Sequence, residues 1–285
     1  MNDEDVSQKE RRYDRPLPVA DGIYWIGSYQ AHNRLLCNPY VIIENGCGVV
    51  IDGGDRPEFA VVMTKLLQTG LDPRDVHYLI YQHYDPDVCG ALPNFIEMCA
   101  SEQRRGEIDL TVFSHGSSRL FLHSYIDRSR HHFISTIDEH DYVLRVHGRT
   151  LRFIGTPYCH TADNFMTYDE RTRTLFTSDL FGSFSRDWEL FLQLDAACHT
   201  CTDTNRCCID KVVCPVAGIV EFHRKIMPSN KALHHAMHIL EQQDIAVIAP
   251  QHGSVLRQPE DIRFIIDLLK NLTGVGIDGI ARADE

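Results

Sequence analysis

The chain has no long hydrophobic run. No segment approaches the roughly 18 apolar residues of a membrane-spanning helix. The N-terminal stretch MNDEDVSQKERRYDR is charged throughout, whereas a secretory signal requires an apolar segment there. We therefore expect no membrane partner and a cytoplasmic location.

Basic residues are also scarce. The chain has 28 Lys and Arg against 40 Asp and Glu, a formal net charge of -12. Nucleic-acid binding draws most of its affinity from Lys and Arg that neutralise phosphates, so we expect no nucleic-acid partner. The 43% hydrophobic and 24% charged residues are ordinary for a folded globular protein.

Linkers and short-period repeats are absent as well. No stretch rich in proline, glycine or serine divides the chain, so we expect one domain over residues 16–285, after a charged tail of residues 1–15. Turn signals at Asn45-Gly46 and His147-Gly148 predict hairpins. Apolar residues at helical spacing predict helices within residues 58–70, 90–100, 117–126, 229–243 and 259–272. In the helix within residues 229–243 we expect Ser229-Asn230 as the cap and Leu233, Met237 and Leu240 on one face.

This mixture predicts an α/β (α+β) fold in which two mainly antiparallel or mixed sheets pack together with helices outside. Plain alternation of strand and helix would instead have indicated a doubly wound parallel sheet. Within the predicted order, four apolar strands each run into a loop that begins with His or Asp. The donors in these loops are His83, Asp85 and Asp87, then His160, then Asp179, and finally His252. The first three have period-two spacing, which in an extended segment stiffened by Pro86 would point their side chains to one side.

Each of these residues alone has an ordinary explanation. A polar turn with Asp as a helix cap explains the segment QHYDPDVCG at least as well as a ligand set does, because turns select Asp for local reasons. The repetition at four strand ends is harder to explain in that way and favours a metal site. Imidazoles with carboxylates suit iron or manganese, and zinc remains an alternative. One carboxylate that bridges two metals would use all six donors.

The segments that carry these donors resemble the metallo-β-lactamase superfamily, and within it the diiron domain of flavodiiron proteins. The resemblance rests on GVVIDGG, HYDPDVCGALPNF, TPYCHTADNFMTYDERTRTLFTSDLFGSF and VIAPQHG. It implies a single αββα sandwich. Hydrolases of the superfamily carry a second histidine where this chain has Asp85, and an anionic donor there helps to stabilise the higher oxidation states of iron.

The resemblance implies two iron ions. It assigns His83, Asp85 and His160 to the first iron, Asp87 and His252 to the second, and Asp179 to a bridge between them. Asp85 is shorter than the glutamate usual in that family. Val88 stands where the family has a further histidine, which implies an open position on the second iron.

The function implied is binding of O2 or NO, with or without reduction, as an oxygen sensor or carrier or as a reductase. The segments contain no counterpart of the flavodoxin-like domain, so we expect no FMN and an external donor, either rubredoxin-like or flavin-based, or a signalling protein as partner. Homodimerisation is left open. The alternative function is a dinuclear metal-dependent hydrolase of an ester or phosphodiester.

Two further sets of residues are candidates. Tyr84, beside the predicted ligands, either donates a hydrogen bond to bound oxygen or is a packed aromatic. The stretch CHTCTDTNRCCIDKVVC has one CxxC pair but not the second that would make a metal signal specific, so a second metal or redox site and a plain insertion with reduced thiols are equally supported. Its cysteines are Cys198, Cys201, Cys207, Cys208 and Cys214.

Overall fold

The computed structural model describes residues 12–29, 35–100, 110–184, 188–201, 207–209 and 214–281. These residues belong to two compact units. Unit 1 comprises Met1–Ala31, Leu36–Ile154 and Asp169–Arg171, and unit 2 comprises His32–Leu35, Gly155–Tyr168 and Thr172–Glu285. Residues 1–11 of the predicted tail lie outside the described residues, and the single-domain boundary at residue 16 stays a prediction.

Unit 1 is built on a seven-stranded sheet in the order β1-β2-β3-β4-β5-β6-β7. Its strands are β1 (Leu17–Ala20), β2 (Ile23–Trp25), β3 (Tyr40–Glu44), β4 (Cys47–Ile51), β5 (Val76–Ile80), β6 (Thr111–Ser114) and β7 (Ile134–Thr136). Pairing is antiparallel from β1 to β4 and parallel from β4 to β7. The predicted mixed sheet is therefore confirmed.

Both predicted hairpin turns are present in unit 1. Glu44 pairs with Cys47 across the turn between β3 and β4, and Val146 pairs with Arg149 across the turn between β8 (Val143–Val146) and β9 (Arg149–Gly155). Asn45 and Gly46 both have positive φ, as do His147 and Gly148. Two consecutive positive φ values are what a two-residue hairpin loop requires, and Asn and Gly adopt them at the least cost.

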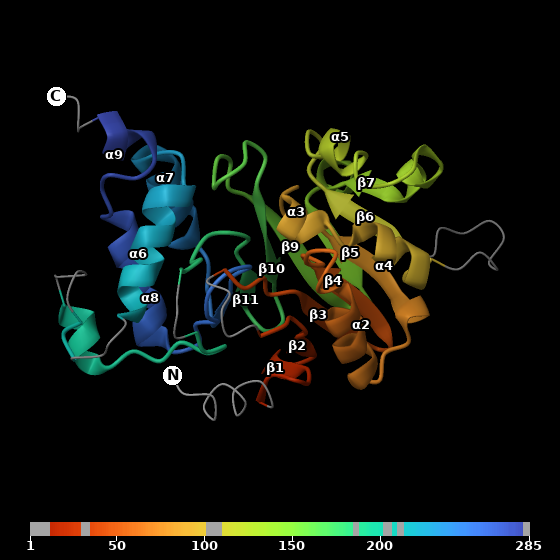
Figure 1. The fold of residues 1–285 in the computed structure, drawn as a ribbon, viewed down its shortest axis with the longest axis horizontal. Coiled ribbons are helices and arrows are strands. Elements are labelled where there is room, and N and C mark those ends of the chain that lie inside the picture. The colour runs from red at the N-terminus through yellow and green to blue at the C-terminus, as the bar shows by residue number, and fades with distance from the viewer. Residues whose placement is uncertain are drawn as a thin grey trace. The chain divides into compact units, whose positions relative to one another are not determined.

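Helices α2 (Phe59–Gln68) and α4 (Leu92–Cys99) lie against one face of the unit 1 sheet (Figure 1). Apolar residues of both helices join strand residues in one buried cluster, which includes Val62, Leu66, Phe95, Val50 and Leu79. The predicted helix at residues 117–126 is shorter than expected, because α5 spans only Arg119–Leu122. The remaining short elements of unit 1 are η1 (Pro73–Asp75), α3 (Pro86–Cys89), η2 (Arg128–Phe133) and η3 (Ile137–His140).

Two buried cations contribute to the interior of unit 1. The guanidinium of Arg149 forms a bidentate pair with Asp169, at 2.8 Å for each N–H···O bond, and both side chains are almost fully buried. The ammonium of Lys65 donates to the carbonyls of Tyr13 and Gly27 and lies 4.1 Å from the ring centroid of Trp25. Burial lowers the pKa of Lys65 to about 8. Charges buried in this way require partners, and here each has them.

Unit 2 contains strands β10 (Phe165–Asp169), β11 (Thr174–Phe176) and β12 (Val247–Ala249), in the order β12-β11-β10, and β11 pairs with β12 in parallel. Its helices are η4 (Ala196–Thr200), α6 (Pro215–Ile226), α7 (Asn230–Leu240), α8 (Pro259–Lys270) and α9 (Ile277–Ala281). The sequence predicted α7 and α8 but not α6.

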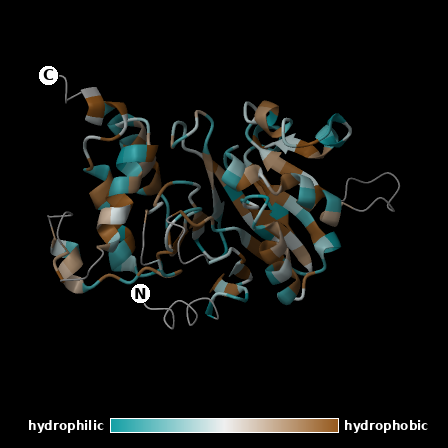
Figure 2. Ribbon diagram, viewed as in Figure 1, coloured by the Kyte–Doolittle hydropathy of each residue, from teal (hydrophilic) through white to brown (hydrophobic). Residues whose placement is uncertain are grey.

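Helices α7 and α8 pack against each other in unit 2. Figure 2 shows that both helices carry hydrophobic as well as hydrophilic residues. The predicted apolar face of α7 is confirmed, because Leu233, Met237 and Leu240 are buried. The hydroxyl of Ser229 accepts the amide of Ala232, which confirms Ser229 as the N-cap. Among the described helices, none is both long and apolar enough to cross a membrane.

Candidate metal centre

The first group of predicted ligands lies entirely within unit 1. We call His83, Asp85 and Asp87 the unit 1 cluster. One donor atom from each of the three residues lies within 4.8 Å of those of the other two. His83 is buried and the two carboxylates are partly exposed. Donors that face each other across a metal at about 2.1 Å are about 4.2 Å apart, so the spacing fits a shared ion.

The end of β4 positions the start of the unit 1 cluster. Asp52, at the end of β4, has a φ of 51° and is buried. Its carboxylate accepts the backbone N–H of Gln82 at 3.0 Å and the side-chain amide of Gln82 at 2.9 Å. Since Gln82 directly precedes His83, these bonds hold the chain at the point where the imidazole leaves the sheet.

The local structure of the unit 1 cluster differs from the prediction in one respect. The sequence predicted an extended segment that points alternate side chains to one side, and this is wrong beyond Asp85. Asp85 is extended, with ψ 153°, but Pro86 begins the one-turn helix α3 and places Asp87 in its first turn. Proline favours the first position of a helix because its φ is already suitable and it has no N–H to satisfy. The donors converge through a helical turn.

The competing explanation of Asp85 as a helix cap can be tested by its geometry. Asp85 occupies the N-cap position of α3, but its side chain makes no capping hydrogen bond. The backbone carbonyl of Asp85 instead accepts the N–H groups of Val88 and Cys89, at 3.0 and 2.9 Å. The local structure therefore does not use this carboxylate as a cap, and its role as a ligand stays a prediction.

Three neighbours of the unit 1 cluster have structural contacts. Val88 is fully buried in the apolar cluster of unit 1. Cys89 donates its S–H to the carbonyl of His83, and burial, followed by the charges of Asp52, Asp87 and Asp85, raises the pKa of its thiol well above the ordinary value. The ring of Tyr84 stacks on Phe121 at 4.2 Å between centroids. This contact supports the packed aromatic alternative, and the role of Tyr84 toward oxygen stays a prediction.

The second group of predicted ligands lies entirely within unit 2. We call His160, Asp179 and His252 the unit 2 cluster. Nε2 of His160 is 2.9 Å from Oδ2 of Asp179, and Nε2 of His252 is 3.6 Å from Oδ1 of the same carboxylate. Asp179 and His252 are each 3% exposed. Each oxygen of a buried carboxylate thus has an imidazole beside it, an arrangement suited to bridging or chelation.

Three loops assemble the unit 2 cluster, and buried polar contacts join them. Asn164 donates to Thr156 at 2.9 Å within the loop that carries His160, and the hydroxyl of Ser178 donates to Asn164 at 2.7 Å. The backbone N–H of Gln251 donates to the carbonyl of Ser178 at 2.9 Å. Because Ser178 and Gln251 directly precede Asp179 and His252, these bonds fix the positions of the ligand backbones.

His223 is a supporting residue that the sequence reasoning missed. It lies on the buried face of α6, where its Nδ1 donates to the carbonyl of Ile219 at 2.8 Å and its Nε2 accepts the N–H of Phe181 at 3.0 Å. Burial lowers the pKa of His223 to about 4, so the ring is neutral at neutral pH. Phe181 has a φ of 68°, and His223 holds this strained turn immediately after Asp179. In the sequence, the only sign of this supporting role is that His223 falls on the apolar face of a possible helix.

The loop after β12 is held by an indole. Nε1 of Trp188 donates to the carbonyl of Gly253 at 2.7 Å, next to His252. Gly253 has a φ of 88°, and a Cβ there would lie 3.0 Å from the amide nitrogen of Ser183. Any other residue at this position would have an unfavourable backbone conformation, and its Cβ would crowd the backbone of Ser183.

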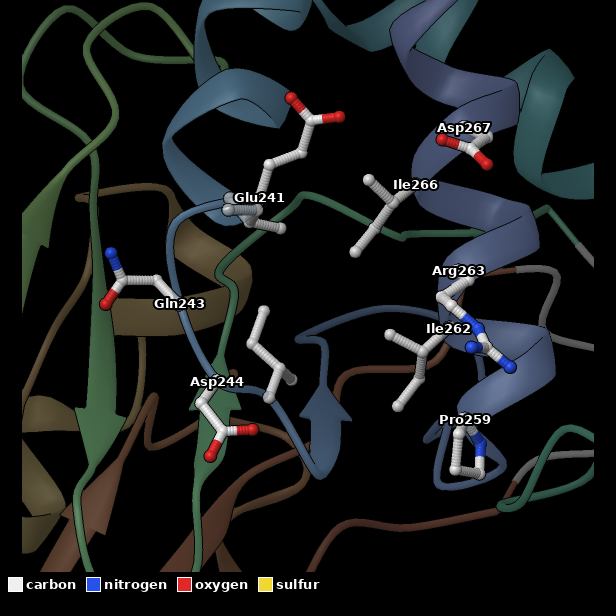
Figure 3. A pocket seen from close by; sticks show the side chains of 10 residues that line it. Glu241, Gln243, Asp244, Pro259, Ile262, Arg263, Ile266 and Asp267 are labelled. Atoms are coloured by element: carbon white, nitrogen blue, oxygen red, sulfur yellow. The ribbon is translucent and has the colours of Figure 1, made fainter.

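A cavity elsewhere in unit 2 has a different character (Figure 3). It has a volume of about 510 Å³ and is lined by the end of α7, the following loop and the first turns of α8. Its carboxylates include Glu241, which pairs with Lys270, and Asp244, which pairs with Arg173 at 2.9 Å. Since these charges already have cationic partners, the cavity does not extend the predicted metal site.

Comparison with known families identifies the fold. The model of the family described as "ODP family beta lactamase" matches residues 35–253, a range that contains all six predicted ligands. The chain belongs to this ODP family. The predicted membership of the metallo-β-lactamase superfamily, in its diiron branch, is thus confirmed.

Relatives and solved structures agree with this membership. The chain is 25% identical over 258 residues to the type A flavoprotein FprA of Rhodobacter capsulatus, covering 86% of this chain and 54% of that protein. It is 25% identical over 260 residues to a nitric oxide reductase of Moorella thermoacetica, covering 86% and 58%. The ODP-family chain thus spans somewhat more than half the length of these relatives.

Two solved structures share the fold. One is described as a peroxy diiron species of the chemotaxis sensor ODP, with a TM-score of 0.69 and 20% identity over 94% of this chain and 99% of that one. The other is rubredoxin oxygen:oxidoreductase from Desulfovibrio gigas, with a TM-score of 0.71 and 20% identity over 90% and 61%. These likenesses confirm the predicted fold class.

Proposed function

We propose that this ODP-family chain binds two iron ions and uses them to bind O2 or NO. The unit 1 and unit 2 clusters would supply the ligands. Following the family resemblance, His83, Asp85 and His160 bind one iron, Asp87 and His252 bind the other, and Asp179 bridges them. The observation that carries the proposal is that each cluster gathers carboxylates and imidazoles within its own unit.

The donor set fits iron. Carboxylate and imidazole donors suit non-haem iron, and each cluster mixes the two types. Two ferrous ions supply the electrons and the coordination positions that a diatomic ligand needs. The protein's part is to hold these donors rigid: Asp52 secures the unit 1 cluster through Gln82, and His223 secures the turn after Asp179. Val88 stands where the family has a further histidine and contributes no ligand, so the second iron would keep an open position for a small molecule.

Relatives support the choice of ligand. The curated relatives include a nitric oxide reductase, and the solved neighbours include an oxygen-reducing enzyme and a chemotaxis sensor with a peroxy diiron species. We place this chain with these proteins and not with the hydrolases, because Asp85 stands where the hydrolases have a histidine. All ten cysteines are free thiols, which supports a reducing, cytoplasmic compartment.

Metal analysis tests the proposal directly. Protein purified anaerobically without added metal should contain about two irons per chain and gain a new visible band on exposure to air. Asp244→Asn should keep both irons, because Asp244 is a carboxylate of unit 2 that is not a proposed ligand and forms an exposed pair with Arg173. Zinc in place of iron, together with phosphodiesterase activity, would refute the proposal in favour of a hydrolase.

Stopped-flow mixing with O2 separates sensing from reduction. A single turnover that leaves a long-lived oxygenated species indicates a sensor or carrier. Steady O2 consumption with a rubredoxin-like or flavin donor indicates a reductase. The same experiment with NO compares the two gases on one protein, and failure to react with either gas would contradict the proposed function.

A further inference from the structure

The cysteine candidates of unit 2 come together only in part. The Sγ atoms of Cys198 and Cys208 are 4.0 Å apart. Among the residues that the structure describes, no three thiols lie close enough together to share a metal ion. A second metal or redox site at this stretch therefore stays a prediction, as do the roles of Cys201, Cys207 and Cys214.

A support of the unit 1 cluster comes from residues far away in the sequence. Tyr84 lies between the proposed ligands His83 and Asp85. Its backbone carbonyl accepts the hydroxyl of Tyr125 at 2.9 Å, and its ring stacks on that of Phe121, with 4.2 Å between centroids and 16° between ring planes. The segment that carries helix α5 thus contacts the residue between two proposed ligands through both its backbone and its side chain.

The α5 segment is itself held in place. Leu122, the last residue of α5, and Ile126 are buried in the apolar cluster of unit 1. Beyond them, the guanidinium of Arg130 donates to the carbonyl of Pro93 at 3.5 Å and pairs with Glu97 of α4. Because the segment is anchored to the core of unit 1 and to α4, it can act as a fixed support for the residue that it contacts.

The hydroxyl of Tyr125 remains a donor at neutral pH. Burial, followed by the charges of Cys89, Asp85 and Asp87, raises the pKa of its phenol to about 12. A phenol that keeps its proton can donate it to the carbonyl of Tyr84. The influence of Asp85 and Asp87 also shows that this phenol lies near the two carboxylates of the unit 1 cluster.

The unit 1 cluster needs such a support because its carboxylates repel each other. Donor oxygens of Asp85 and Asp87 lie within 4.8 Å of each other, and like charges at that distance favour a wider separation until a cation neutralises them. Asp52 holds the chain before His83, and α3 holds the residues after Asp85. The contacts of Tyr84 hold the residue in between, so they oppose opening of the turn in the metal-free protein.

We propose that Phe121 and Tyr125 are positioning residues, which hold the unit 1 cluster in its metal-binding conformation through Tyr84. This inference rests on the proposed binding of metal by that cluster and does not depend on which gas the centre binds. When only the closed turn binds metal, loss of the support lowers the apparent affinity in proportion to the population of the closed turn. Coupling between two sites is reciprocal, so metal bound at the cluster should in turn stabilise α5.

Hydrogen exchange on the wild-type chain tests this reciprocity and does not depend on a variant folding. The amides of Leu122 and His123 donate to the carbonyls of Ser118 and Arg119, so their exchange reports opening of the segment. We expect ferrous iron, added anaerobically, to slow exchange in residues 117–126 more than in α2 of the same unit. Equal slowing in both regions, or none in α5 while iron is bound, would overturn the proposal.

Tyr125→Phe removes the hydroxyl and keeps the ring. We expect an anaerobic titration with ferrous iron to show about threefold weaker binding of one iron, the lower part of the range for one hydrogen bond, because the donors themselves come from one turn. Tyr168→Phe is the matched control, since the hydroxyl of Tyr168 donates to the carbonyl of Asp244 in unit 2 at 2.7 Å. It should lose a similar amount of stability in denaturant and keep the affinity of the wild type for iron. Equal iron affinity in the two variants would contradict positioning by Tyr125.

The ring of Phe121 has its own controls. Phe121→Ala removes the stack on Tyr84 and should weaken iron binding by about threefold, whereas Phe121→Tyr keeps a ring and should bind iron as the wild type does. Leu120→Ala shortens the neighbouring side chain, which is 73% exposed, and should have no effect. A loss of affinity that Phe121→Tyr does not restore, or that Leu120→Ala shares, would overturn the role of the stack.

The wild type and the variants together separate this proposal from the proposed function. Wild-type protein that binds no iron contradicts the proposed function itself. Wild-type protein that binds two irons, with Tyr125→Phe and Phe121→Ala binding them equally well, leaves the proposed function in place and overturns only the support through Tyr84.

Discussion

The two clusters of proposed iron ligands are assembled in different ways. The unit 1 cluster comes from one short turn, residues 83–87, whereas the unit 2 cluster comes from three loops between residues 160 and 252. The turn is built on the end of β5 and the proline that begins α3, and Asp52 anchors it through Gln82. The three loops need contacts between distant parts of unit 2. The unit 1 cluster therefore depends mainly on local structure, whereas the unit 2 cluster depends on tertiary structure.

Removal of the shared carboxylate should have the largest effect. Asp179→Ala should abolish retention of both irons, because both imidazoles of the unit 2 cluster approach this one side chain and the proposed bridge serves each metal. His252→Ala should mainly affect one iron. Iron analysis with visible spectra on anaerobic protein measures both, and two irons retained in Asp179→Ala would contradict the assignment.

Loss of the support beneath the unit 2 cluster should have the next largest effect. His223→Phe leaves the buried N–H of Phe181 without its acceptor, at about 1–3 kcal/mol, and removes the side-chain donor to the carbonyl of Ile219. We expect lower unfolding free energy and weaker iron retention. His223→Gln keeps an acceptor for Phe181 and should recover part of both, as denaturant titration and iron analysis will measure. Equal losses in the two variants would argue against positioning through that bond.

The corresponding support in unit 1 should matter less. Asp52→Asn replaces one acceptor oxygen by an N–H group that faces donors on Gln82, at a cost of about 1–3 kcal/mol. Because the unit 1 cluster is local, we expect this variant to lose stability while it keeps most of its iron. If Asp52→Asn lost as much iron as His223→Phe, the proposed difference between the two clusters would be wrong.

The smallest expected effect is a pH dependence that originates in unit 1. The pKa of Lys65 is lowered from 10.5 to about 8 in the folded protein. Between these values the unfolded chain binds the proton and the folded chain does not, so this group adds stability as pH rises and loses it as pH falls through 8. The gain is at most about 1.4 kcal/mol per pH unit.

Lys65→Met isolates this contribution, since the variant lacks the titrating group. The difference in unfolding free energy between wild type and variant should move in favour of the wild type from pH 8 to pH 10, as chemical denaturation at each pH will show. A difference that is constant with pH would mean that Lys65 stays protonated through its contacts with Tyr13, Gly27 and Trp25.

The sequence predicted those parts of the fold that depend on neighbouring residues. The turns at Asn45-Gly46 and His147-Gly148 follow from the positive φ that these residues tolerate, and α7 follows from Ser229 and the spacing of its apolar residues. The family membership and fold class were also predictable, because each ligand segment retains its own pattern around the donor. The roles of the six ligands as iron ligands stay a prediction.

What the sequence did not predict depends on distant partners. His223 looks like any histidine on a helix until Phe181 is placed beside it, and the chain from Asn164 through Ser178 to Gln251 links positions that no local pattern connects. Asp87 was misplaced for a different reason, since Pro86 was interpreted as a stiff extended residue when it is the first residue of α3. Proline fits both an extended segment and the first position of a helix. The hydrogen bonds from the N–H groups of Val88 and Cys89 to the carbonyl of Asp85 show that it begins a helix here.

The two indoles allow the two units to be observed separately. The chain has 2 tryptophans: Trp25, buried in unit 1 beside Lys65, and Trp188, buried in unit 2 with its N–H on the carbonyl that follows His252. With Trp25→Phe or Trp188→Phe, the remaining fluorophore reports on its own unit alone. Emission from Trp188 should be quenched when iron reaches the neighbouring imidazole, so the protein carries an intrinsic optical probe of metal loading.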